Sequence, residues 1–168
     1  MRQAKRLYED DVVAWAEQQA KALRDAAVSK SNLPIDWENV AEEIEDLAKA
    51  YKSSLKSQLR RVIQHLVKLQ YSPAVDPRPG WRRTIRLARL EIQDLLEESP
   101  SLKREVGGLI ENVTQSAIQL AIADLTDYDE MNPLRAVVVR RHSYNEEQVL
   151  GDWLPPEPKE PGASAEEP

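Results

Sequence analysis

The chain has 168 residues, of which 41% are hydrophobic and 31% charged, a composition typical of one globular domain and not of a disordered chain. It contains no cysteine and only two histidines, which excludes disulfides and thiol nucleophiles and argues against a His-rich metal centre. No apolar run approaches the ~20 residues of a membrane span, and the N-terminus lacks the apolar core of a signal peptide, so we expect a cytoplasmic protein without membrane contact.

The net charge of −6 conceals a strong separation of charge along the chain. Residues 49–89 hold eleven basic residues and one acid, whereas residues 90–130 hold ten acids and two bases. One interpretation is internal, with acidic helices packed beside basic helices in the domain. The other is that the basic segment 49–89 binds an anionic partner. The sequence leaves both interpretations open.

The first predicted helix covers Tyr8–Val28. Apolar residues at helical spacing include Trp15, which we expect to anchor this helix in the core. Acids at positions 9–11 fall in the first turn, where the helix dipole favours negative charge.

The stretch Asp36–Tyr71 is expected to organise the fold, because it contains neither Gly nor Pro and keeps one apolar seam at helical spacing. Asp36 is a favourable N-cap. A straight helix over this stretch would be about 54 Å long, so we expect it to protrude, or to bend or break near Ser53–Ser57. The seam residues are Val40, Ile44, Leu47, Tyr51, Leu55, Leu59, Val62, Leu66 and Leu69.

Two further helices are predicted after a proline-rich loop at Tyr71–Gly80. The first restarts at Trp81 and ends at Ser99-Pro100, a pair that favours the start of the next helix. That next helix contains Gly107-Gly108. We expect the glycine pair to permit close approach of a neighbouring helix, with a hinge as the alternative.

The C-terminal part of the chain carries shorter signals. The β-branched run at Ala136–Arg140 predicts a short extended segment. Ser143–Glu146 matches a capping box and Gly151 can end a helix, so a short helix is expected over residues 144–150. From Pro155 onward the composition predicts disorder.

Together these elements predict an all-α fold, a helical bundle of about four main helices around one long central helix, with a short C-terminal helix. We expect a single helical domain over residues 1–154, followed by a disordered Pro-rich tail over residues 155–168. The sequence shows no internal repeat that would indicate a solenoid.

No motif of established chemistry is present: there is no P-loop, Rossmann glycine pattern, HExxH motif or nucleophile elbow. A carboxylate cluster is formed by Glu42, Glu43, Glu45 and Asp46. Di-metal bundles need Glu-x-x-His pairs, however, and neither histidine has a glutamate three residues before it. We therefore predict no metal site, no cofactor and no catalytic residues.

Two sets of basic residues are candidates for anion binding. In the first set, Arg61 and Lys68 flank His65 at helical spacing, and such a group can bind a phosphate or a carboxylate. The alternative is a histidine at the edge of the core whose ring nitrogen is paired with a neighbouring helix. The second set is a ridge formed by Arg82, Arg86 and Arg89.

This arginine ridge can contact the phosphates of a nucleic acid, although no nucleic-acid-binding motif accompanies it. The alternative is internal pairing of Arg86 and Arg89 with Glu42 or Glu43 of the long helix. The acidic pI of 5.1 argues against a nucleic-acid role.

Five stretches carry a resemblance to a known family: Tyr8–Arg24 (YEDDVVAWAEQQAKALR), Asp36–Leu47 (DWENVAEEIEDL), Leu59–Pro73 (LRRVIQHLVKLQYSP), Trp81–Lys103 (WRRTIRLARLEIQDLLEESPSLK) and Tyr144–Pro155 (YNEEQVLGDWLP). In their order and spacing they resemble the domain of unknown function 29 family of bacterial proteins. The resemblance implies a mostly helical, cytoplasmic bacterial protein and no particular activity. The departures are Gly107-Gly108, which leads us to expect an irregular helix there, and the Pro-rich tail.

We therefore expect a non-enzymatic protein-interaction module whose partner is an unidentified protein or a second copy of the chain. The alternative function is binding of an anionic ligand or nucleic acid through the basic segment 49–89. An enzyme built on His65 is the third and least favoured alternative, because no carboxylate in its own helix orients the ring.

Overall fold

The structure is a computed structural model that describes residues 2–29 and 33–157. Its elements in chain order are α1 (Arg2–Asp10), α2 (Val12–Val28), α3 (Trp37–Tyr71), α4 (Arg78–Glu98), the 3₁₀ helix η1 (Pro100–Arg104), α5 (Val106–Asp127), α6 (Pro133–Val139) and α7 (Glu146–Leu150). No strand occurs in the described residues, so the predicted all-α fold around one long helix is confirmed. Most of the predicted tail, residues 158–168, lies outside the described residues.

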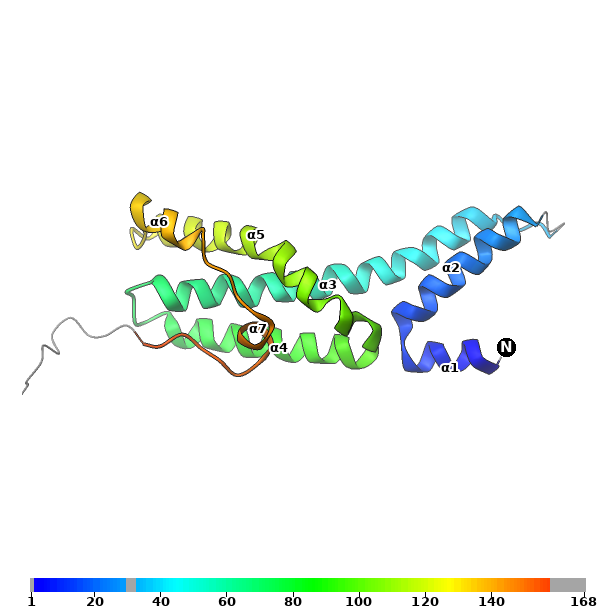
Figure 1. Cartoon of the computed structure of the whole chain (residues 1–168), viewed down its shortest axis with the longest axis horizontal. Coiled ribbons are helices and arrows are strands. Elements are labelled where there is room, and N and C mark those ends of the chain that lie inside the picture. Colours follow the sequence, from blue (N-terminus) through cyan, green and yellow to red (C-terminus); the bar gives the residue numbers. More distant parts are fainter. Residues whose placement is uncertain (1, 30–32, 158–168) are drawn as a thin grey trace, which may run out of the picture.

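Two regions are arranged along α3 (Figure 1). In the first region, α4 and α5 pack against the C-terminal half of α3, α6 packs on α5, and α7 packs on α3 and α5. We call this region, which includes residues 53–71 of α3, the body. In the second region, α2 pairs with residues 37–52 of α3 to form a helical hairpin that projects from the body (Figure 1). We call this hairpin the arm.

The central helix α3 is continuous over 35 residues, so a break near Ser53–Ser57 is wrong. Asp36 is its N-cap as predicted, and the carboxylate accepts a hydrogen bond from the amide of Asn39 at 3.3 Å. The serines do not interrupt the helix, because Leu55 and Leu59 beside them are fully buried and packing outweighs the weak helix preference of serine. The helix keeps its length by projecting into the arm (Figure 1).

In the body, the seam of α3 is covered by α4. The seam residues of the range Leu55–Leu69 are at most 1% exposed. The two helices run antiparallel, so Gln58 bonds to Glu91, and Glu98 at the end of α4 lies beside the hydroxyl of Tyr51. Tyr51 is therefore the last seam residue that α4 reaches.

In the arm, the same seam is only partly covered. α2 packs against Ala41 and Ala48, which are at most 2% exposed. Val40 and Leu47 lie at neighbouring positions on a different side of the helix and are 39% and 38% exposed. The strip of α3 that α4 covers in the body is thus without a covering helix in the described part of the arm.

The predicted first helix, Tyr8–Val28, is wrong in that it divides at Asp11 into α1 and α2. Asp11 has an extended backbone and caps α2 by accepting from the amide of Ala14 at 2.8 Å. Its carboxylate also accepts from the amide of Ser101 in η1 at 2.6 Å and from the Ser101 hydroxyl at 3.0 Å. Aspartate is favoured at N-caps, and the donors from η1 stabilise the division further. Asp11 thereby joins the arm to the body.

The start of α4 is also corrected. The helix begins at Arg78 rather than at Trp81, because Pro77 and Pro79 lie at positions where a helix needs no amide donor. Arg78 is 2% exposed and donates to the backbone carbonyl of Leu69 at 2.8 Å, which satisfies an acceptor in the last turn of α3.

The predicted roles of Gly107-Gly108 are wrong. Both glycines lie in the exposed first turn of α5, directly after η1, and α5 is a regular helix to Asp127. A Cβ atom added to Gly108 would meet no atom within 4 Å, and one added to Gly107 would meet only a carboxylate oxygen at 3.9 Å. The pair therefore permits no close helix approach.

Two local caps correct the C-terminal prediction. Ala136–Arg140 is not extended, because Asn132 caps α6 and a proline follows at the first helical position. β-branched residues lower helix preference only slightly, so the cap decides the outcome. The helix near residue 146 is confirmed, but its capping box is formed by Asn145 and Gln148 rather than by Ser143.

Candidate functional site

The first predicted anion-binding set, Arg61, His65 and Lys68, lies along one edge of α3. Lys68 forms an ion pair with Asp124 of α5, and its Nζ lies 6.0 Å from the centre of the Trp81 ring. The His65 ring donates through Nδ1 to the backbone carbonyl of Arg61 at 2.9 Å. Arg61 itself is exposed. Arg61 also donates to Oε1 of Gln58 at 3.2 Å, so all three side chains are bonded within the protein.

The charges of this edge follow from those bonds. Burial lowers the pKa of His65 from its ordinary value, so the ring is neutral at pH 7. Burial raises the pKa of Asp124, but hydrogen bonds from Lys68 and Gln64 outweigh that effect, and its pKa lies below the ordinary value. Asp124 is therefore charged and offsets the charge of Lys68, which leaves Arg61 as the uncompensated cation of the set.

The second predicted set, the arginine ridge of α4, divides among three environments. Arg89 donates to the backbone carbonyls of Gln148, Val149 and Trp153 at 2.8–2.9 Å, and so holds the C-terminal segment against α4. Arg82 forms an ion pair with Glu157. Arg86 is exposed and has no hydrogen-bond or ion-pair partner among the described residues.

The two sets lie on different helices, the first on α3 and the arginine ridge on α4, and their bonded members have different neighbours. Lys68 meets the Trp81 edge and α5, whereas Arg89 meets the segment around α7. The alternative pairing of Arg86 and Arg89 with Glu42 or Glu43 is not made, since those acids lie in the arm. Anion binding by the six residues stays a prediction.

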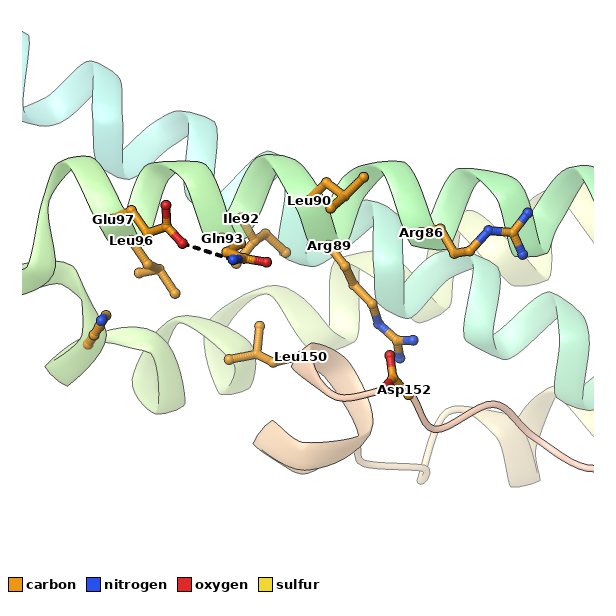
Figure 2. A pocket seen from close by; sticks show the side chains of 10 residues that line it. Arg86, Arg89, Leu90, Ile92, Gln93, Leu96, Glu97, Leu150 and Asp152 are labelled. Carbon is orange, nitrogen blue, oxygen red and sulfur yellow. Dashed lines mark hydrogen bonds between the residues drawn. The ribbon is translucent and has the colours of Figure 1, made fainter.

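A groove of about 510 Å³ lies between α4, η1 and the segment around α7 (Figure 2). Its apolar lining comes from Leu90, Ile92 and Leu96 of α4 and from Leu150 of α7, which points toward them. Glu97 accepts a hydrogen bond from Gln93 at 2.8 Å along its wall. The remaining lining residues are Arg86, Arg89, Lys103 and Asp152. A preformed apolar hollow with a few charged groups at its rim is the usual form of a binding site.

The outer face of α4 continues this groove into solvent. Leu87 and Leu90 are 50% and 57% exposed, one turn apart. Arg83 and Arg86 lie one turn before them on the same face, and neither has a bond partner in the part of the chain that the structure describes. We call Arg83, Arg86, Leu87, Leu90 and the groove residues Leu96, Lys103 and Leu150 the α4 surface.

Most of the α4 surface was absent from the sequence-based candidates, which contained only Arg86. The signal that marks the rest is the presence of two leucines on the face opposite the buried seam of Ile85, Ala88 and Ile92. Amphipathic helices of single domains normally carry polar residues there. Leu150 and Lys103 come from other elements, and only the fold brings them to α4.

Neither a cluster of metal ligands nor a membrane-spanning helix occurs in the described residues. Within residues 2–29 and 33–157, no three acidic or histidine side chains converge in a way that could hold a metal ion. None of the described helices has both the length and the apolar character needed to cross a membrane.

Comparisons with known proteins agree with the fold. A crystal structure of an alpha-helical protein of unknown function from Rhodospirillum rubrum is similar, with a TM-score of 0.67 and 23% sequence identity. The similarity covers 86% of this chain and 89% of that chain, and at this identity it shows the fold alone. No curated protein matches the chain.

The family comparison covers nearly all of the helical part. The sequence model of the family described as "Domain of unknown function DUF29" matches residues 7–154, which run from the end of α1 to the segment after α7. This agrees with the family that the five sequence stretches resemble. Because the match spans far more than half of the length of this chain, the chain belongs to the family Domain of unknown function DUF29.

Proposed function

We propose that this protein is a non-enzymatic protein-interaction module that binds an acidic, amphipathic helix of a partner on the α4 surface. One observation carries the proposal: two exposed leucines and two unpaired arginines share a rigid helix face beside a preformed apolar groove. This combination lacks the paired nucleophile and base, or the metal ligands, that an enzyme site requires.

The leucines supply the affinity in this proposal. Full burial of a leucine side chain contributes about 1.5–3 kcal/mol relative to exposure, and Leu87 and Leu90 each have half or more of that change still available. A partner helix can place one apolar side chain in the groove against Leu96 and Leu150. A few residues near the centre of an interface usually carry most of its binding free energy, and here the leucines lie beside Arg86, a residue type that is common among them.

The arginines supply the selectivity. Residues 78–90 contain five arginines and no acid, and Arg83 and Arg86 are the two whose guanidinium groups are uncommitted among the described residues. A guanidinium group pairs with carboxylates in a bidentate geometry and repels basic side chains of a partner. The same residues therefore favour a helix with carboxylates beside its apolar positions.

Site-specific cross-linking tests the proposal. The photo-reactive amino acid p-benzoylphenylalanine replaces Leu87 in the full chain, produced in the cells from which its gene comes. The control replaces Leu134 of α6, which is 84% exposed but lies outside the α4 surface. We expect one discrete adduct at Leu87, none at Leu134, and at least tenfold less adduct when Arg83→Glu and Arg86→Glu are added.

The identity of the adduct decides the outcome. Mass spectrometry should place the cross-link on a helix that has acidic residues three or four positions from apolar ones. The proposal is overturned by the absence of any adduct, by the same adduct at both positions, or by an adduct that the two glutamates leave unchanged.

A further inference from the structure

We infer that the helix bound by the α4 surface is the arm of a second copy of this chain, and that two copies exchange arms in a two-fold dimer. The inference rests on the proposed function, because it names the partner of the same surface. It starts from the strip of α3 that has no covering helix in the arm.

The exposed strip of the arm has the chemistry that the α4 surface selects. Val40, Glu43 and Leu47 are three and four residues apart and therefore share one face of α3. Val40 and Leu47 are more than a third exposed, and Glu43 is exposed with no partner among the described residues. Asp46, one turn after Glu43, lies beside this face, is 54% exposed and forms an ion pair with Lys49 of the same helix at 2.8 Å. The strip is thus apolar with an acidic border.

The charges of the two surfaces are complementary over a longer range. Residues 36–48 of the arm contain six acids and no base, whereas residues 78–90 of α4 contain five arginines and no acid. Among the described residues, Glu43 of the arm has no ion-pair partner within the chain, and neither have Arg83 and Arg86 of α4. Opposite charges that remain uncommitted at the edges of two apolar strips favour their association.

The position of the strip explains why a helix like α4 is the occupant. In the body, the corresponding strip of α3 is covered by the protein's own α4, which ends beside Tyr51. In the arm, a second α4 can continue the same type of helix pair through its outer face, with Leu87 and Leu90 against Val40 and Leu47. The contact joins the arm of one copy to the α4 surface of the other. Two-fold symmetry therefore repeats the same contact with the roles of the copies exchanged.

The repetition matters for stability. Stable interfaces bury roughly 1,600 Å² in total, and two or three turns of a single helix pair supply only part of that area. In the two-fold dimer, the arm of each copy lies on the α4 surface of the other, which doubles the buried area and closes the assembly. A one-sided contact would leave one arm and one α4 surface open to further copies.

Charge reversal tests this dimer in the purified full chain by sedimentation equilibrium. The arm variant carries Glu43→Lys and Asp46→Lys, and the α4 variant carries Arg83→Glu and Arg86→Glu. The wild-type chain should be dimeric at micromolar concentrations, and each variant should dissociate at least tenfold more readily. Because all four positions are exposed, helix content by circular dichroism should stay unchanged.

Mixing the two variants gives a second readout that misfolding cannot imitate. The arm of the first variant and the α4 surface of the second are complementary, and so are the α4 surface of the first and the arm of the second. An equimolar mixture should therefore form a heterodimer with at least tenfold tighter association than either variant alone. A matched control, Glu111→Lys with Arg141→Glu, reverses two exposed charges elsewhere in the body and should dimerise like the wild type.

The possible results separate the two proposals. Any of three results overturns the proposed dimer. The wild-type chain is monomeric, or it forms a dimer that neither charge reversal weakens, or the mixture of the two variants fails to associate. If the Leu87 cross-link then joins a different acidic protein, the proposed function stands and only this inference fails. If the Leu87 cross-link is also absent, both fail.

Discussion

The arm and the body contain halves of one helix, yet the two halves are stabilised differently. In the body, α4 and α5 cover α3, and its seam residues are at most 1% exposed. In the arm, α2 covers it through small alanines, and Arg24 forms a 2.5 Å ion pair with Glu45 that is exposed to solvent. The comparison teaches that a continuous apolar seam does not imply a continuous core, because each part of the seam needs its own covering element.

The largest expected effect separates these halves directly. Leu59→Ala in the body removes a fully buried side chain and should lower the free energy of unfolding by about 3 kcal/mol. Leu47→Ala in the arm removes a side chain that is 38% exposed and should cost less than ~1 kcal/mol in the monomer. Urea unfolding at low protein concentration measures both values. Equal losses would contradict the division into a covered and an uncovered half.

An intermediate effect is expected at the joint between the regions. Asp11→Ala removes the cap of α2 and both hydrogen bonds from Ser101, and should cost about 2 kcal/mol. Asp36→Ala is the matched control, because Asp36 caps α3 at the exposed end of the arm, and we expect about 1 kcal/mol there. Urea unfolding gives both losses, and hydrogen exchange should show faster opening at the start of α2 only in Asp11→Ala. If both substitutions cost the same, Asp11 is a cap and not a joint.

The smallest effect is expected from pH, and it should affect the body before the arm. Burial lowers the pKa of both His65 and His142 in the body, so each is protonated more readily in the unfolded chain. Their contribution to stability is complete above the ordinary histidine pKa and is lost as the pH falls through it toward the folded pKa. In the arm, the hydrogen bond from Arg24 lowers the pKa of Glu45, so that contribution persists until the pH falls below the ordinary glutamate range.

Thermal unfolding between pH 7 and pH 5 measures this difference. The midpoint of the wild-type chain should fall with pH, and the double variant His65→Gln with His142→Gln should flatten the curve. Glu45→Gln should leave its slope unchanged in this range. An unchanged slope in the double histidine variant would show that other groups carry the pH dependence.

The parts of the fold that sequence predicts are those with strong local signals. The long helix could be placed because Asp36 caps it and the apolar seam runs to Leu69 without a glycine or proline. The division at Asp11 could not be predicted, because its second set of donors comes from Ser101, ninety residues away in the chain. An apolar seam indicates which face of a helix is apolar, but it does not indicate where the helix that covers this face ends. The uncovered strip at Val40 could therefore be seen only in the structure.

The candidate site shows the same limit. Regular spacing predicted that Arg82, Arg86 and Arg89 share an edge of α4. Spacing could not tell that Arg89 turns inward to carbonyl groups while Arg86 stays in solvent, because both have the same side chain. The exposed leucines were present in the sequence as apolar residues opposite the seam, and treating them as candidates would have found two more of the seven residues of the α4 surface.

The attachment of the C-terminal segment by Arg89 has a consequence for which sequence changes this segment tolerates. Its three hydrogen bonds end on main-chain oxygens at positions 148, 149 and 153, and every amino acid presents such an oxygen. The arginine therefore depends on the backbone position of the segment and not on the identity of its side chains. Substitutions at these positions leave the acceptor oxygens in place, whereas replacement of Arg89 would remove all three hydrogen bonds at once.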